Sequence, residues 1–194
     1  RIWVAFERNG AVGRFTLTPE GRLSDFADVT PPGKRIRYGS NKGLEALAML
    51  PDGHRHAGML LGIAEESLDR AGNHLAWYGN DAGRYDFTIR HTDDFAITDA
   101  VFLPDGKLVT LERRFSMRVA PAFRIRRFDL SELAPDRLLE GETLIEAGLE
   151  YRIDNMEGID AWVDDQGRTR LILISDDNFN FLQSTILLEF VLAQ

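Results

Sequence analysis

The feature that most constrains the fold is a hairpin pattern that occurs three times along the chain. Each copy has an apolar strand, a turn that ends in glycine and a second apolar strand, and the turn glycines are Gly53, Gly106 and Gly167. In the third copy, residues 171–174 read LILI between turn residues and carry no helix start or stop signal, which favours a buried strand. A period of roughly 50 residues with several strands per repeat is typical of a β-propeller or another radial repeat.

We therefore predict an all-β chain that folds as a β-propeller, with about three and a half four-stranded blades. Its first strand reads as the second strand of a blade and its last strand reads as a third, so both sheet edges would be open. We expect either residues outside this numbering or a second copy of the chain to complete the ring. Two segments, residues 64–70 and 130–139, also suit short helices. The predicted segments are a partial blade in residues 1–40 and blades in residues 41–95, 96–152 and 153–194.

Acidic residues recur at matching places in these repeats. Glu45, Asp99 and Glu157 open the first strands, each six or seven residues before an aspartate of the turn. A second set closes the second strands and consists of Glu7, Glu65, Glu112 and Asp176. Because the innermost strands of a propeller line its central channel, equivalent residues of successive blades should form rings around that channel.

Carboxylates that converge in this way suit two kinds of chemistry. They bind a hard cation such as Ca²⁺ through oxygen ligands, or they raise one another's pKa until one of them serves as an acid. In the alternative, the acids accept hydrogen bonds from backbone N–H groups of adjacent blades, and the acidic loop at residues 176–178 only forms an Asx-type turn. The candidate ligands for Ca²⁺ are Glu45, Asp99, Glu112, Glu157, Asp176 and Asp177.

Hydrolysis of a phosphate ester also needs positive charge near the reacting oxygens. Lys42 and Arg113 lie beside acids in the sequence and could supply it; in the alternative, they form salt bridges at the rim. The chain contains no H-E-x-x-H, G-x-S-x-G or phosphate-binding glycine loop, which argues against zincins, α/β-hydrolases and nucleotide-binding folds. The candidate catalytic residues are Glu45, Glu112, Glu157, Arg113 and Lys42.

Composition narrows the possible partners. The net charge of −8 argues against nucleic acid and anionic membranes. Residues 113–127 contain six arginines, which strand alternation would place on the solvent face of an outer strand. No apolar run reaches the ~20 residues that a membrane-spanning helix needs. With no cysteine, the chain forms neither disulfides nor thiolate metal sites.

Several segments resemble the family named esterase-like activity of phytase. They are GLEALAMLPDG, ITDAVFLPDGKLVTLERRFS and NMEGIDAW followed by LILISDDNF, and the resemblance extends from about residue 2 to residue 192. It implies a β-propeller with a ring of about six blades, an acidic central face and phosphoesterase activity. It also implies export to the periplasm or the outside of the cell. Family members are longer, so the chain resembles their C-terminal part.

Three functions are compatible with these residues. The first is an exported, phytase-like phosphoesterase that acts on a small phosphorylated compound, which predicts hydrolysis that is sensitive to chelators. The second is a non-catalytic propeller that binds a ligand or a protein on its acidic face, which predicts binding without turnover. The third is a structural fragment whose acids only satisfy backbone donors. A fold resemblance alone does not establish activity.

Overall fold

The computed structural model describes residues 1–6, 9–33, 43–116 and 119–193. These residues form fifteen strands and no helix, which confirms the predicted all-β class. The strands make four sheets, and the first sheet is antiparallel with the order β1-β2-β3. Its strands are β1 (Ile2–Phe6), β2 (Ala11–Leu17) and β3 (Leu23–Asp28).

The other three sheets are also built mainly from antiparallel neighbours in the chain. The second sheet contains β4 (Leu44–Met49), β5 (Leu60–Leu68), β6 (His74–Asn80) and β7 (Gly83–Ile89). Its outer edge is β11 (Leu138–Leu139), which pairs parallel with β7. The third sheet contains β8 (Ala96–Phe102), β9 (Leu108–Ser116), β10 (Val119–Phe128) and β12 (Glu142–Ala147). The fourth contains β13 (Met156–Val163), β14 (Thr169–Ser175) and β15 (Leu187–Val191).

The three repeated hairpins of the sequence are the strand pairs β4–β5, β8–β9 and β13–β14. Their turn glycines Gly53, Gly106 and Gly167 have φ angles of 92°, 82° and 74°. This left-handed region is readily adopted by glycine and strained for most other residues. The predicted hairpins and the need for glycine in their turns are therefore confirmed.

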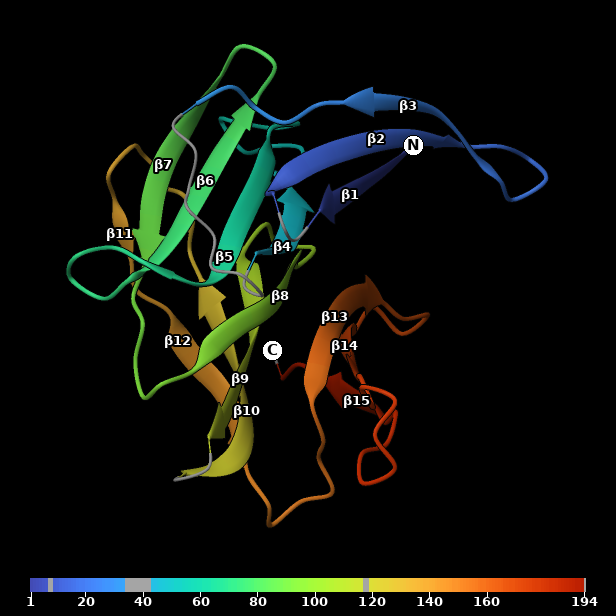
Figure 1. Cartoon of the computed structure of the whole chain (residues 1–194), viewed down its shortest axis with the longest axis vertical. Helices are drawn as coiled ribbons and strands as arrows, with labels where there is room; N and C mark the ends of the chain where they lie inside the picture. Colours follow the sequence, from blue (N-terminus) through green and yellow to red (C-terminus); the bar gives the residue numbers. More distant parts are fainter. Residues whose placement is uncertain (7–8, 34–42, 117–118, 194) are drawn as a thin grey trace.

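The four sheets follow one another in chain order. Figure 1 shows the sheet of β1–β3 at the top, the next two sheets on the left and below, and the sheet of β13–β15 at the lower right. The first strands of the last three sheets are neighbours, because β4 contacts β8 and β8 contacts β13. Side chains at the start of these strands are therefore brought toward one another.

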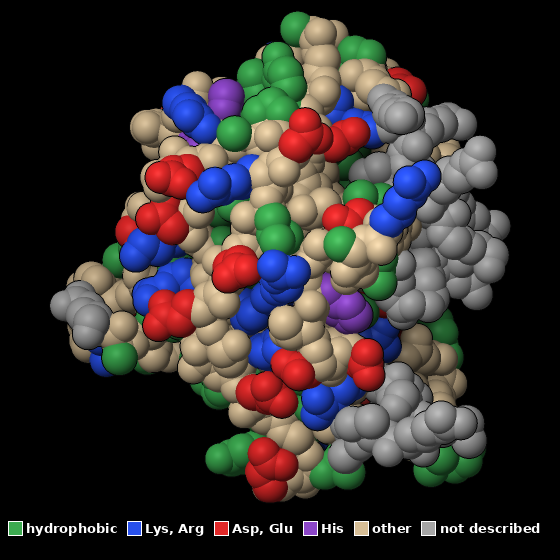
Figure 2. Space-filling model, turned by 90° about the vertical axis from the view of Figure 1, so that its left-hand side faces the viewer, with side chains coloured by type: hydrophobic (Ala, Val, Ile, Leu, Met, Phe, Trp, Pro, Cys, Tyr) green, Lys and Arg blue, Asp and Glu red, His purple; other side chains and the backbone are tan. Residues whose placement is uncertain are grey.

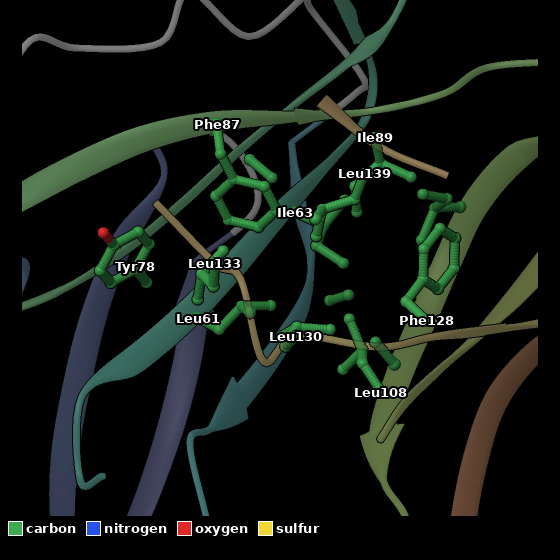
Figure 3. Packing of buried hydrophobic residues seen from close by; sticks show 14 of the residues in the cluster. Leu61, Ile63, Tyr78, Phe87, Ile89, Leu108, Phe128, Leu130, Leu133 and Leu139 are labelled. Carbon is green, nitrogen blue, oxygen red and sulfur yellow. The ribbon is translucent and has the colours of Figure 1, made fainter. Parts of the chain in front are cut away.

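Apolar side chains fill the space between neighbouring sheets, as alternation along each strand requires. Figure 3 shows the cluster that joins the second and third sheets, which includes Ile63, Phe87, Leu108 and Phe128. A second cluster joins the third and fourth sheets and includes Leu111, Phe123, Ile159 and Leu173. A third joins the first and second sheets and includes Val12, Leu44, Leu60 and Trp77.

The two segments that suit short helices form none. Residues 64–68 belong to β5, and residues 130–139 form turns that end in β11. Leu130, Leu133 and Leu139 are buried in the cluster between the second and third sheets. Their spacing of three and six residues therefore reflects a chain that packs across strands, not an amphipathic helix.

The surface mixes both signs of charge. Figure 2 shows acidic and basic side chains interspersed over one face of the molecule. The surface carries exposed ion pairs, such as Arg90 with Glu140 at 3.1 Å and Arg137 with Glu132 at 2.8 Å. No helix among the described residues is long and apolar enough to cross a membrane.

Candidate functional site

Each repeated hairpin contains a ladder irregularity at the same place. The paired residues before it are Leu44 with Ala64, Ile97 with Glu112, and Met156 with Ser175. In each first strand one residue is then passed over before pairing resumes, which is the arrangement of a β-bulge. The residues passed over are Glu45, Thr98 and Glu157.

This register corrects the first predicted ring. Thr98, and not Asp99, is the structural equivalent of Glu45 and Glu157. Asp99 lies six residues before its turn aspartate whereas the two glutamates lie seven residues before theirs, and that difference of one moves Asp99 out of line. A shift of one residue turns a strand side chain to the opposite face of the sheet.

The same register corrects the second predicted ring. The residues that follow the pairing partners are Glu65, Arg113 and Asp176, so these three are equivalent. Glu112 instead matches Ala64 and Ser175, which are buried. The cation Arg113 therefore occupies the position for which the sequence pattern predicts the acid Glu112.

Arg113 of β9 joins three sheets at this place. Its Nη2 donates to Glu65 Oε1 of β5 at 3.1 Å and lies 3.4 Å from Glu157 Oε1 of β13. Its Nη1 donates to Asn155 Oδ1, and Asn155 Nδ2 donates to Glu157 Oε1 at 2.7 Å. We call these four residues the Arg113 cluster.

The Arg113 cluster is shielded but open to small molecules. The side chain of Glu65 is 10% exposed, that of Arg113 is 26% exposed and that of Glu157 is 33% exposed. Burial raises the pKa of Glu157, which the Arg113 guanidinium and the Asn155 amide partly offset. The charges of Glu65 and Asp176 raise the pKa further. Glu157 therefore holds a proton more readily than an ordinary glutamate.

Glu112 does not join this cluster, because it is fully buried in an ion group within the third sheet. Its Oε2 accepts from Arg124 Nη2 at 2.6 Å and its Oε1 accepts from Arg126 Nε at 2.6 Å. Arg124 also pairs with Asp93 at 3.2 Å. Both arginines are buried and belong to β10, which has a paired strand on each side. The prediction that they lie on the solvent face of an outer strand was therefore wrong. The pairing satisfies buried charges.

Asp99 ties two sheets together. Its Oδ2 accepts the backbone N–H of Ile159 in β13 at 2.9 Å, and its Oδ1 accepts the N–H of Ala100 at 2.8 Å. Burial raises the pKa of Asp99 to about 6. Thr98 also links the third and fourth sheets, because its hydroxyl donates to Met156 O at 3.2 Å. Asp99 therefore makes the contacts that the alternative to a metal site predicts, in which the acids accept hydrogen bonds from backbone N–H groups of the adjacent sheet.

The other candidate residues that the structure describes accept hydrogen bonds from backbone N–H groups two residues away in the sequence. Glu45 accepts the N–H of Gly43 at 3.1 Å, and Lys42 and Glu7 lie outside the described residues. Asp176 accepts the N–H of Asn178 and Asp177 accepts the N–H of Phe179, both at 2.9 Å. These are Asx-type turns, the arrangement considered as the alternative for the acidic loop.

The acids proposed as Ca²⁺ ligands are not brought together as they stand. Among the described residues, no three histidine, aspartate or glutamate side chains are placed to hold a metal ion. At the Arg113 cluster, the guanidinium bonds to both Glu65 and Glu157 and so lies between the two carboxylates. The site therefore combines one cation, two acids and an amide.

A cleft of about 510 Å³ opens beside the Arg113 cluster and is lined by Arg113 and Asn155. A slightly larger cleft, of about 580 Å³, lies between the hairpin turns of the second and third sheets, at the other end of these strands. We place the candidate site at the first cleft because Arg113 and Asn155, which line it, both contact Glu157, a carboxyl with a raised pKa. An arginine beside such a carboxyl is the combination that acid–base chemistry requires.

Of the four cluster residues, the sequence pattern predicts Arg113 and Glu157 as candidate site residues, places Glu65 only in the second acidic ring and does not identify Asn155. Asn155 lies two residues before Glu157, in the N-x-E pattern that opens the third hairpin. Its amide oxygen and nitrogen bridge Arg113 and Glu157. The asparagine of that pattern is a signal that could have identified it.

Comparison with known proteins identifies the family of this chain. The family model Phytase-like, described as esterase-like activity of phytase, matches residues 1–179. No curated protein matches the chain. Since the matched region covers most of the chain and includes all four residues of the Arg113 cluster, the chain belongs to the Phytase-like family, esterase-like activity of phytase.

Proposed function

We propose that this protein hydrolyses a small phosphorylated compound, and that the reaction takes place at the Arg113 cluster. The observation that carries the proposal is the position of Arg113, which bonds to Glu65 and Glu157 from two other sheets. An arginine can bind phosphate oxygens through several N–H groups, and a carboxyl with a raised pKa can transfer a proton near neutral pH. Membership of the Phytase-like family supports the same class of reaction.

The roles follow from the contacts. Arg113 and Asn155 bind oxygens of the phosphoryl group and stabilise the charge that gathers there. Water attacks the phosphorus atom, the P–O bond to the organic group breaks, and protonated Glu157 gives its proton to the leaving oxygen. Glu65, on the same guanidinium, accepts the proton of the attacking water. The products are the free alcohol and inorganic phosphate.

The variant Glu157→Gln tests this proposal. We expect kcat/KM for phenyl phosphate to fall by about 100-fold or more, since the general acid is lost. We also expect the wild-type rate to fall as pH rises through the pKa of Glu157, and the rate of the variant to lack this fall. The matched control is Glu132→Gln, in a surface pair whose glutamate is 76% exposed. Full activity of Glu157→Gln at an unchanged melting temperature would overturn the assignment.

We further propose that the four sheets are successive blades of a β-propeller. In support, β5 lies against β8 and β9 lies against β13, so the second strand of one sheet meets the first strand of the next. β1 lies against β4 in the same manner, which suits a second strand. Stacked sheets with their first strands innermost are the blade arrangement. From the family resemblance alone we also propose that the protein acts in the periplasm or outside the cell, which fractionation of expressing cells would test.

Calcium has no step in this mechanism. Carboxylate oxygens are the ligands that Ca²⁺ prefers, but Arg113 bonds to both acids of the cluster, so the residues as placed do not fit the ion. Calcium binding stays a prediction.

A further inference from the structure

The cleft beside the Arg113 cluster is lined by both polar and apolar residues. Its polar lining includes Arg113, Arg114 and Asn155. Leu149, Ile153 and Leu182 also line the cleft. The side chains of Leu149 and Leu182 are 65% and 77% exposed, so neither is used in packing the core. Exposed leucines that line a cleft are a ready contact for an apolar group.

The wall that carries Leu182 is held in place by side-chain hydrogen bonds. Asp154 accepts the backbone N–H of Ser184 at 2.8 Å and the Nε2 of Gln183 at 3.2 Å, which fastens this loop to the segment that leads into β13. Asn180 Oδ1 accepts the N–H of Leu182 at 3.1 Å. A wall that is already ordered loses little entropy when a ligand binds.

The charges around the cleft limit how much negative charge a ligand can carry. Arg113 faces the carboxylates of Glu65 and Glu157, and Asp154 lines the same cleft. Arg114 also lines the cleft and lies 3.9 Å from Glu146. Because both arginines already face carboxylates, further phosphates on the same molecule would lie close to these acids and be repelled. A compound with many phosphate groups is therefore a poor fit.

We propose that the cleft selects phosphate monoesters of apolar or aromatic alcohols, with the phosphoryl group at Arg113 and the organic group against Leu149, Ile153 and Leu182. This inference rests on the proposed function and names its substrate class. It excludes polyphosphorylated polyols as preferred substrates, because they offer no apolar surface to the leucines and too much charge to the acids.

The test compares two probes that share a head group, phenylphosphonate and methylphosphonate, by calorimetric titration of the whole chain. We expect phenylphosphonate to bind at least about tenfold more tightly, since apolar contacts of this size discriminate by that factor. Inositol hexakisphosphate should bind no more tightly than inorganic phosphate. Equal affinity for the two phosphonates, or tighter binding of inositol hexakisphosphate, would overturn the inference.

The variant Leu182→Asp should lose the preference for phenylphosphonate, and its fold should be unaffected because the side chain is exposed. The matched control is Leu23→Asp on β3, at a side chain that is 51% exposed, and it should keep the preference. A preference that survives Leu182→Asp would contradict the proposed cleft.

Turnover separates this inference from the function on which it rests. If phenyl phosphate is not hydrolysed but phenylphosphonate keeps its tenfold preference, hydrolysis is refuted and the apolar cleft stands. If phenyl phosphate and glycerol phosphate are hydrolysed equally well, hydrolysis stands and the apolar cleft is refuted.

Discussion

Asp99 shows how a single carboxyl can link sheets and still cost stability. It accepts the N–H of Ile159 across the boundary between the third and fourth sheets, yet burial raises its pKa to about 6. In the unfolded chain the same group ionises near pH 4, so the folded state binds the proton more tightly. Its contribution to stability is therefore largest at low pH and falls as pH rises from about 4 to about 6.

We predict that Asp99→Asn gains stability relative to the wild type as pH rises. Asparagine keeps an acceptor for Ile159 but carries no charge, so the free energy of unfolding should shift in its favour by up to about 3 kcal/mol between pH 4 and pH 7. Urea unfolding at several pH values measures this shift. The control is Asp105→Asn in a turn, where the carboxylate is 52% exposed. A difference between variant and wild type that does not change with pH would refute the assignment.

Arg113 forms ion pairs with Glu65 and Glu157, whose carboxylate oxygens are of the kind that calcium prefers. We predict that Arg113→Met makes the chain responsive to calcium, because Glu65 and Glu157 then lose their cation and Asp176 lies near. Millimolar Ca²⁺ should raise the melting temperature of the variant more than that of the wild type, since a ligand of the folded state stabilises it. The control is Arg127→Met, in a pair with the exposed Glu142. A larger calcium effect on the wild type would show that Arg113 does not block the ion.

At the scale of residues, the prediction came only to within one position. Repeat spacing placed Asp99 and Glu112 in the rings, although Thr98 and Arg113 are the true equivalents. For the first ring the sequence held the answer, because Glu45, Thr98 and Glu157 each lie seven residues before the turn aspartate and Asp99 lies six. The search for an acid selected Asp99 in place of Thr98. Because side chains alternate between the two faces of a strand, an error of one residue assigns a side chain to the wrong face of the sheet.

Glycines inside strands control how closely side chains can pack on an element. Gly62 of β5 lies under the indole ring of Trp77, and a Cβ at this position would overlap that ring and lie 2.7 Å from Leu44 Cδ1. A Cβ added at Gly83 of β7 would meet no atom within 4 Å, and Gly83 has no positive φ. The two positions therefore differ in the space around them, and neither has a positive φ.

We predict that Gly62→Ala destabilises the chain by about 1–3 kcal/mol, the usual cost of overpacking a core. Gly83→Ala should cost nothing measurable and serves as the matched control. Thermal and urea unfolding give both values. Equal stability of the two variants would mean that Trp77 and Leu44 can move aside without cost.

At the scale of elements, the sequence predicts the strands that carry strong local signals and does not predict those with weak ones. The three hairpins could be predicted because apolar runs meet turns that need glycine, as at Gly106. The strand β11 could not, since it has only two residues and pairs in parallel with β7 across a long stretch of chain. Leu130 and Leu133 suited a helix because a turn segment that packs on a sheet can have the same spacing of apolar residues.

At the scale of the molecule, the repeat predicts four sheets in succession but cannot by itself show how they close. Two faces remain uncovered among the described residues. On the first sheet, Phe6, Phe15 and Phe26 gather on the side away from β4, and Phe26 is 59% exposed. On the fourth sheet, Ile174 and Leu187 are paired neighbours with exposures of 45% and 62%. Every other face between these sheets is packed with apolar side chains.

We therefore predict that the 194-residue chain associates with itself in solution. Where neighbouring sheets pack, one face of a sheet contacts the preceding sheet and the opposite face contacts the following sheet. The first sheet leaves the former face uncovered and the fourth sheet leaves the latter uncovered. A head-to-tail contact between copies would therefore bury both. Light scattering should give a mass above 21.9 kDa that rises with concentration. Phe26→Ser and Ile174→Ser should each lower the mass, whereas Leu68→Ser, an exposed apolar position at the end of β5, should not. A monomer at all concentrations would show that these faces are tolerated in water, and the contact between copies would then be refuted.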